Sequence, residues 1–195
     1  MDAITLRDGS TLAVRPIEPG DKEGLERGFE KLSEDSRYKR FLSPTPRLSD
    51  AQLRYLTEVD HHDHEALVAI AGDGDGPGVA RFVRLADDPD AAEVAVAVRD
   101  DWQGRGVGTG LLRALVERAR EEGIERFTAT ALASNHEVID LLDEIGPADV
   151  TPAADGTVEM RIDLVPDSAD ESRLRRALRS AARGLIEVRE RRGER

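Results

Sequence analysis

The feature that most constrains this chain is a glycine-rich turn between an apolar strand and a long helix. Val94–Val98 is an unbroken apolar run of strand length, and the sequence QGRGVG follows it at 103–108. From about Gly106 to Glu122, apolar residues recur at helical spacing, and Gly123 ends the pattern. Glycines at such a junction let the backbone approach a ligand closely. The exposed amides and the helix dipole then favour a phosphate or pyrophosphate.

The details of this turn exclude two common nucleotide-binding loops. A Walker A loop needs Gly-Lys-Ser/Thr, which is absent, and a Rossmann fingerprint needs Gly-x-Gly-x-x-Gly. Thr109 or Leu111 stands where the third Rossmann glycine would be. Gln103 and Arg105 can add side-chain donors to a phosphate. The turn therefore predicts a phosphate site of another kind.

The rest of the chain predicts an α/β fold. Strands at 65–71, 79–85 and 93–99 are joined by tight loops and predict an antiparallel meander. Ser49 and Gln52 form a capping box for a helix that runs to about residue 58. We therefore expect a mixed, mostly antiparallel central sheet with helices on both faces. The further expected elements are a hairpin at 3–16, helices at 19–32, 36–42, 106–122 and 135–145, and strands at 127–132 and 158–164.

Composition narrows the functional classes. The chain has 195 residues, 39% apolar and 35% charged, which suits one soluble globular domain. A net charge of -12 argues against nucleic-acid binding, because phosphates would be repelled. The absence of cysteine excludes disulfides and thiolate catalysis. Without a membrane-length apolar run or signal-peptide pattern, we expect a cytoplasmic protein with no membrane partner.

The C-terminal stretch stands apart from this pattern. Residues 168–192 combine a capping box, an apolar stripe and an arginine-rich face, which predicts an amphipathic helix. We divide the chain into a domain at 1–166 and a helical extension at 167–195. The helix could pack on its own domain, form an oligomer or dock a partner, or bind a membrane surface.

The loop also carries a family resemblance. The pattern Gln103-x-x-Gly106-x-Gly108 resembles the pyrophosphate loop of GNAT acetyltransferases, Arg/Gln-x-x-Gly-x-Gly/Ala, and Asn135 and Gly146 follow at the usual spacing. The resemblance covers about residues 3–164 and implies a GNAT-like fold with acetyl-CoA as co-substrate and no metal. By resemblance, the backbone of Val96 and Val98 holds the acetyl-pantetheine arm, and Asn135 contacts the pantetheine or the adenosine end. The amides implied to hold the pyrophosphate are those of Gln103, Gly104, Arg105, Gly106, Val107, Gly108 and Thr109.

Within that family, the chain resembles the catalytic domain of bacterial protein lysine acetyltransferases of the Pat kind. The residues that carry this likeness are 36–41 (SRYKRF), 59–69 (VDHHDHEALVA) and 92–95 (AEVA). Glu93 begins an apolar strand and lies on the same side as Ala95 and Ala97. By resemblance, a glutamate on this strand is the general base, which makes Glu93 the candidate. The other interpretation of Glu93 is an exposed carboxylate at a strand end.

Two features leave alternatives open. His61, His62 and His64 could hold a metal, border the acceptor site, or belong to a capped turn. Many GNAT enzymes place a tyrosine, as general acid, where this chain has Leu142. Either the thiolate leaves without that acid, or Tyr38 or Tyr55 serves instead.

The predicted activity is transfer of an acetyl group from acetyl-CoA to a primary amine, with a protein lysine as acceptor and an acyl-CoA synthetase as the partner that the resemblance implies. A small amine, such as a polyamine or an aminoglycoside, is the second acceptor class, because an acidic protein attracts polycations. The third alternative is a non-catalytic module that binds acyl-CoA.

Overall fold

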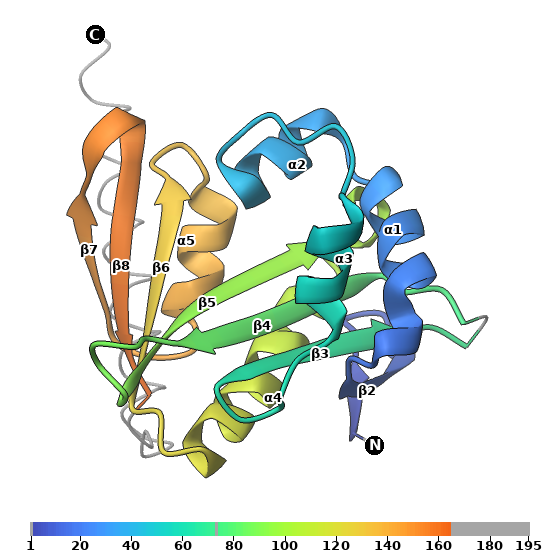
Figure 1. Ribbon diagram of the computed structural model, residues 1–195, viewed down its shortest axis with the longest axis horizontal. Helices are drawn as coiled ribbons and strands as arrows, with labels where there is room; N and C mark the ends of the chain where they lie inside the picture. The colour runs from blue at the N-terminus through green and yellow to red at the C-terminus, as the bar shows by residue number, and fades with distance from the viewer. Residues whose placement is uncertain (1, 73, 165–195) are drawn as a thin grey trace, which may run out of the picture. The chain divides into compact units, whose positions relative to one another are not determined.

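The computed structural model describes residues 2–72 and 74–164, which form one sheet with helices against it (Figure 1). The strands lie in the order β1-β2-β3-β4-β5-β6-β8-β7. All neighbouring pairs are antiparallel except β5 and β6, which confirms a mixed, mostly antiparallel sheet. The predicted C-terminal helix at 168–192 lies outside the described residues. The strands are β1 (Asp2–Thr5), β2 (Thr11–Pro16), β3 (His64–Ile70), β4 (Gly78–Arg84), β5 (Ala91–Val98), β6 (Arg126–Leu132), β7 (Ala148–Pro152) and β8 (Thr157–Asp163).

Helices cover both faces of the sheet, as the sequence predicted. Figure 1 shows α4 behind the central strands and α1 and α3 in front of them. The buried stripe of α4 joins the main core together with Phe82 and Phe127 of the sheet, whereas α1 to α3 share a smaller core around Phe29. Within the described residues, no helix is long and apolar enough to cross a membrane. The helices are α1 (Lys22–Glu30), α2 (Glu34–Phe41), α3 (Asp50–Thr57), α4 (Val107–Glu121) and α5 (His136–Asp143), and short 3-10 turns lie at Pro19–Asp21, Asp100–Trp102 and Ala154–Gly156.

Local signals placed several element ends correctly. The Ser49 hydroxyl accepts a hydrogen bond from the Gln52 amide, and the Gln52 side chain accepts one from the Ser49 amide in return, so the predicted capping box is present. Gly123 has a φ of 75° just after α4, where the left-handed conformation favours glycine. These ends are readable from sequence because caps satisfy backbone groups with nearby residues.

One strand was missed. The sequence pattern predicted a single strand after α5, but β7 and β8 form a hairpin there. β7 is an edge strand whose residues are mostly exposed, so it carries no alternation of apolar and polar residues. Its place is set by backbone pairing with β8, which leaves no mark on its side-chain pattern.

The parallel pair β5 and β6 opens partway along its length. The two strands pair only through residues 91–93 of β5 and 126–128 of β6. Beyond Glu93, β5 continues for five residues to Val98 and stays paired to β4 alone. The two strands therefore diverge at the point where the candidate site begins.

Candidate active site

A cavity of about 690 Å³ lies where β5 and β6 separate. Its walls come mainly from four parts of the chain: the free half of β5, the glycine turn with the start of α4, the end of β6 with α5, and α2. The sequence predicted the first two, and Asn135 from the third. The contribution of α2 is a property of the tertiary structure.

The free edge of β5 presents backbone donors and acceptors to this cavity. Arg99 donates to Pro77, in register with the β4–β5 ladder, so the bonded pairs alternate through Ala97 and Ala95. The N–H and C=O groups of Val96 and Val98 consequently point away from β4, into the gap. These are the two residues that the family resemblance singled out. Geometry and resemblance therefore agree on which backbone groups are available.

The glycine turn leaves its amides open. Gly104 and Gly106 have φ values of 71° and 97°, the left-handed region that favours glycine. Gly106 is the N-cap of α4, and no side chain caps it. In the described part of the chain, Gly110 is the first residue after Gln103 whose backbone N–H has a backbone acceptor. The turn thus offers a helix N-terminus with unsatisfied N–H groups next to the cavity.

Of the two polar side chains in the turn, that of Gln103 faces the cavity and that of Arg105 contacts neighbouring parts of the fold. Gln103 lines the cavity and donates to the Val98 carbonyl at 3.1 Å. Arg105 does not line it: its guanidinium pairs with Asp8 at 2.8 Å and lies over the Trp102 ring. Trp102 packs against the main core and so anchors the turn. Arg105 is therefore placed to hold the turn, and its predicted role as a phosphate donor gets no support from its side chain.

Arg7 contributes to the site without any signal in the sequence. It lies between β1 and β2, lines the cavity, and donates from Nη1 to the Gly104 carbonyl at 3.1 Å. Its backbone N–H also bonds the Arg105 carbonyl. Nothing in its local sequence marks it, because it is 97 residues from the glycine it contacts. It brings a positive charge to the turn.

Asn135 has a structural role in addition to its place in the cavity wall. It is buried, and its side-chain oxygen accepts from the Val138 amide as the N-cap of α5. Gly108 of α4 packs against Leu141 of α5, where a Cβ would come within 2.9 Å of Leu141. The wall opposite β5 is therefore tied to both the glycine turn and α5.

Glu93 lies at the inner end of the free edge of β5. Its side chain is exposed and lines the cavity, on the sheet face that also carries Arg81 and Ala95. Arg40 of α2 lines the cavity nearby and interacts electrostatically with Glu93. A carboxylate therefore faces the end of the cavity farthest from the glycine turn.

α2 is held over the cavity by the turn itself. The Asp100 carboxylate accepts from the Ser33 amide and hydroxyl and from the Ser36 hydroxyl at 2.8–3.0 Å. These bonds lower the pKa of Asp100, although partial burial opposes them. Asp100 therefore fixes the start of α2 and, with it, the position of Arg40.

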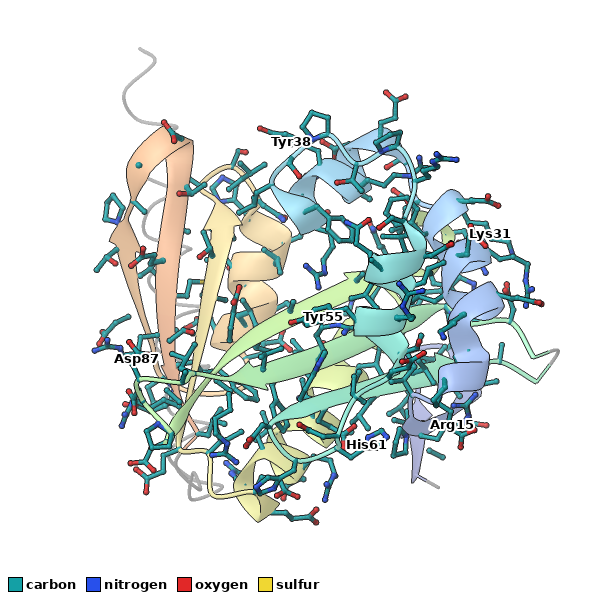
Figure 2. All side chains as sticks on the ribbon, viewed as in Figure 1. Arg15, Lys31, Tyr38, Tyr55, His61 and Asp87 are labelled. Carbon is teal, nitrogen blue, oxygen red and sulfur yellow. The ribbon has the colours of Figure 1, made fainter. Side chains whose placement is uncertain are left out.

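An apolar side chain, that of Leu142, occupies the position where many GNAT enzymes have a tyrosine. Leu142 is buried and lines the cavity. Figure 2 shows Tyr55 over the central strands and Tyr38 on α2. Neither is among the residues that line the cavity, and both are more than 40% exposed. No described tyrosine is thus placed as a proton donor inside it.

The histidine segment is a capped turn. The Asp60 carboxylate accepts from the amides of His62, Asp63 and His64 at 2.8–2.9 Å, which confirms that interpretation. The three imidazoles have different partners: His61 contacts Glu65, His62 contacts Glu122, and His64 contacts Arg81. Among the described residues, no group of three or more histidine and carboxylate side chains could hold a metal ion. None of the three histidines lines the cavity.

Comparisons with known proteins agree with this architecture. Residues 28–146 match the family model described as the Acetyltransferase (GNAT) family. The chain is 37% identical to Acetyltransferase Pat of Mycolicibacterium smegmatis over 165 residues, which is 84% of this chain and 49% of that protein. The chain therefore spans about half the length of that relative.

Solved structures show the same relationship. The GNAT domain of S. lividans PAT is 37% identical, with a TM-score of 0.78 over 84% of this chain and 96% of that one. A phosphinothricin acetyltransferase from Sinorhizobium meliloti, solved in complex with AcCoA, shares the fold at 17% identity, with a TM-score of 0.67 over 78% of this chain and 88% of that one. The fold and the cavity define an acyltransferase-type α/β protein. The chain belongs to the GNAT acetyltransferase family.

Proposed function

We propose that this chain transfers an acetyl group from acetyl-CoA to the side-chain amine of a lysine in a protein substrate. The observation that carries the proposal is the continuity of the site. An uncapped helix N-terminus, the free edge of β5 and the carboxylate of Glu93 follow one another along a single cavity. Such an order suits a molecule with a pyrophosphate at one end and a reacting thioester at the other. The resemblance of residues 36–41, 59–69 and 92–95 to protein lysine acetyltransferases of the Pat kind implies a protein acceptor.

The pyrophosphate would lie on the glycine turn. The amides of residues 103–109 and the dipole of α4 attract its charge, and Arg7 adds a cation. The pantetheine arm would run along β5 and bond the backbone of Val96 and Val98 like a further strand. Asn135 would border the arm from the opposite wall.

Glu93 would act as the general base. A lysine with a pKa of about 10.4 is almost wholly protonated at neutral pH, so a proton must leave before the amine attacks. The nitrogen then bonds the thioester carbon, the C–S bond breaks, and CoA departs as the thiolate. The proton of the ammonium passes to Glu93 directly or through water, and the second proton, which the nitrogen loses as the amide forms, is taken up by the departing thiolate or by water. A backbone N–H of the free β5 edge would stabilise the carbonyl oxygen as it gains negative charge.

The departing thiolate would leave without a general acid from the family's tyrosine position, which is Leu142 here. A thiol has a pKa of about 8.5, so its anion is a far better leaving group than an alkoxide. The sequence left Tyr38 and Tyr55 open as substitutes, and neither lines the cavity. We therefore assign no residue to this step.

The assignment of Glu93 is tested by Glu93→Gln. We expect the rate of acetyl transfer to fall by roughly 10²–10⁴ while acetyl-CoA affinity stays close to that of the wild type. The assay measures release of free CoA with a purified acyl-CoA synthetase as acceptor, and then with a polyamine panel. Glu159→Gln is the matched control, because Glu159 is an exposed strand carboxylate that does not line the cavity. An unchanged rate in Glu93→Gln would refute the assignment of Glu93 as general base. Release of free CoA with polyamines but not with the synthetase would show that the acceptor is a small amine and not a protein.

The placement of the pyrophosphate is tested by two glycines of the same helix. Gly106 and Gly123 flank α4, and both have positive φ; at either position an added Cβ would have no heavy atom closer than 3.7 Å. Gly106→Val and Gly123→Val should therefore strain the backbone similarly. Only Gly106→Val should abolish acetyl-CoA binding in a calorimetric titration. Equal affinities for the two variants would rule out the turn as the pyrophosphate site.

A further inference from the structure

Arg40 lies at the junction of two cavities. The second cavity, of about 440 Å³, is between the α1–α3 layer and the sheet, and its lining is largely apolar. Four residues line both cavities: Leu32, Arg40, Phe41 and Ala97. A substrate group that extends beyond the unpaired edge of β5 would therefore meet the Arg40 guanidinium at the entrance to the second cavity.

Arg40 has no anionic partner at contact distance. Its guanidinium makes no hydrogen bond or ion pair with any residue that the structure describes, although it lies 5.1 Å from the centre of the Phe41 ring. Partial burial lowers its pKa, and the charge of Glu93 opposes that effect. A half-buried guanidinium without a partner is unfavourable for stability, because it loses water without gaining a counter-charge.

A second arginine increases this imbalance. Arg81 of β4 is 5% exposed, and its partners are neutral: Nη1 contacts His64 Nε2 at 3.0 Å and Nη2 donates to the Leu56 carbonyl at 3.1 Å. Burial, and then the charge of Arg40, lower the pKa of Arg81 to about 10. The carboxylate whose charge acts on Arg40 is that of Glu93, and among the described residues Glu93 is within ion-pair distance of neither arginine.

Other arginines around the second cavity are neutralised. Arg15 pairs with Asp21 at 2.7 Å, and Arg99 pairs with Asp75 and Asp101. Arg15 and Arg99, which line the second cavity, thus have carboxylate partners. Among the described residues, Arg40 and Arg81 have none at contact distance. Buried positive charges without a negative partner lower stability, and they are expected where a bound ligand supplies the missing negative charge.

We propose that Arg40, backed by Arg81, binds a carboxylate carried by the substrate. The guanidinium fork matches a carboxylate with two parallel hydrogen bonds, and one added negative charge would balance the two arginines and Glu93. The carboxylate can come from two sources. It can be the far end of a dicarboxylic acyl group, such as succinyl, that extends from the thioester toward the second cavity, or it can belong to the amine acceptor. The inference rests on the proposed placement of acyl-CoA along β5.

The first arm of the test concerns the acyl group. Binding of succinyl-CoA and butyryl-CoA, which have equal numbers of acyl carbons, is measured by calorimetry. If the acyl group supplies the carboxylate, the wild type should bind succinyl-CoA about tenfold more tightly. Arg40→Gln should lose that preference. Arg54→Gln should keep it, because Arg54 is exposed on α3 and lines neither cavity.

The second arm concerns the acceptor. With saturating acetyl-CoA, kcat/KM is compared for 6-aminohexanoate and hexylamine, which differ by the carboxylate. A preference of about tenfold for 6-aminohexanoate that Arg40→Gln removes would assign the carboxylate to the acceptor. A carboxylate preference in neither arm, or one that persists in Arg40→Gln, would overturn the proposal. Failure of the wild type to bind acetyl-CoA itself would instead overturn the proposed function on which it rests.

Discussion

Two charged side chains lie on neighbouring strands but on opposite faces of the sheet, and their surroundings differ sharply. Glu65 of β3 is fully buried on the α4 face, where it contacts Arg118 at 3.3 Å, His61 at 2.8 Å and the Ala66 amide. Arg81 of β4 is nearly as buried on the other face, with only neutral partners and Arg40 nearby. Burial alone therefore does not distinguish the two sites.

The two sites differ in whether the buried charge has a partner of opposite charge at contact distance. Arg118 pairs with Glu65, Glu121 and Glu122, and His61 also contacts Glu65, so the buried carboxylate of that cluster has partners at contact distance. The α1–α3 face instead leaves Arg40 and Arg81 without a carboxylate at contact distance among the described residues. Removing one partner of a buried charge pair is strongly destabilising, whereas a buried charge without a partner of opposite sign is a candidate for binding. Removing charges from each face should therefore change stability in different ways.

The largest effect is expected on the α4 face. Arg118→Met would leave the fully buried Glu65 without its cation, so the free energy of unfolding should fall by about 3 kcal/mol. Urea denaturation followed by circular dichroism measures this. The control is Arg113→Met, an exposed arginine of the same helix, which should change stability by less than about 0.5 kcal/mol. Equal losses in the two variants would show that the Glu65 cluster is not a stabilising unit.

A double variant sharpens that prediction. Glu65→Leu combined with Arg118→Met removes both charges, so it should be less destabilising than the sum of the single variants by about 1–3 kcal/mol. The same denaturation experiment, applied to the wild type, the two single variants and the double variant, completes a double-mutant cycle. Simple additivity would mean that the contact between the two side chains contributes little.

A smaller, pH-dependent effect is expected next to Arg81. Burial, and then the charge of Arg81, lower the pKa of His64 from 6.5 to about 4. Between these values the unfolded chain binds the proton and the native state does not, so stability falls as the pH drops from 6.5 toward 4. We expect a loss of ~2 kcal/mol, discounted because His64 is only partly buried. Unfolding measured at several pH values should show a shallower loss in His64→Gln, whose amide oxygen can still accept from Arg81. An identical pH dependence would assign the slope to other groups.

The smallest effect on stability is expected at Arg40. Because its charge has no contact partner, Arg40→Met should leave the free energy of unfolding unchanged or raise it by about 1 kcal/mol. Denaturation alongside Arg118→Met gives the direct contrast between the two arginines. A loss of about 3 kcal/mol in Arg40→Met would place it in a structural network and remove the charge imbalance that we infer.

Local chemistry made much of the fold predictable. The capping box at Ser49, the glycines around α4 and the meander of β3, β4 and β5 all depend on residues close in the chain. β7 was missed because an exposed edge strand has no pattern of its own. The glycine turn was found by its position between a strand and a helix, and Glu93 by the family resemblance together with its place on a strand, whereas Arg7 and Arg40 reach the cavity from segments that only folding brings there.

The sequence by itself determined the elements, the glycine turn and the carboxylate at the start of β5, because propensities, caps and turns act over a few residues. Only the tertiary structure decided that β5 and β6 separate after Glu93, that Asp100 holds α2 over the gap, and that the charge of Arg40 acts on Arg81. The physical reason is that the charge balance of a site depends on contacts between segments far apart in the chain. Arg40 lies in the segment at 36–41 that carries the Pat likeness, but nothing in the sequence links it to Arg81, and their juxtaposition becomes informative only once the sheet and helices have packed.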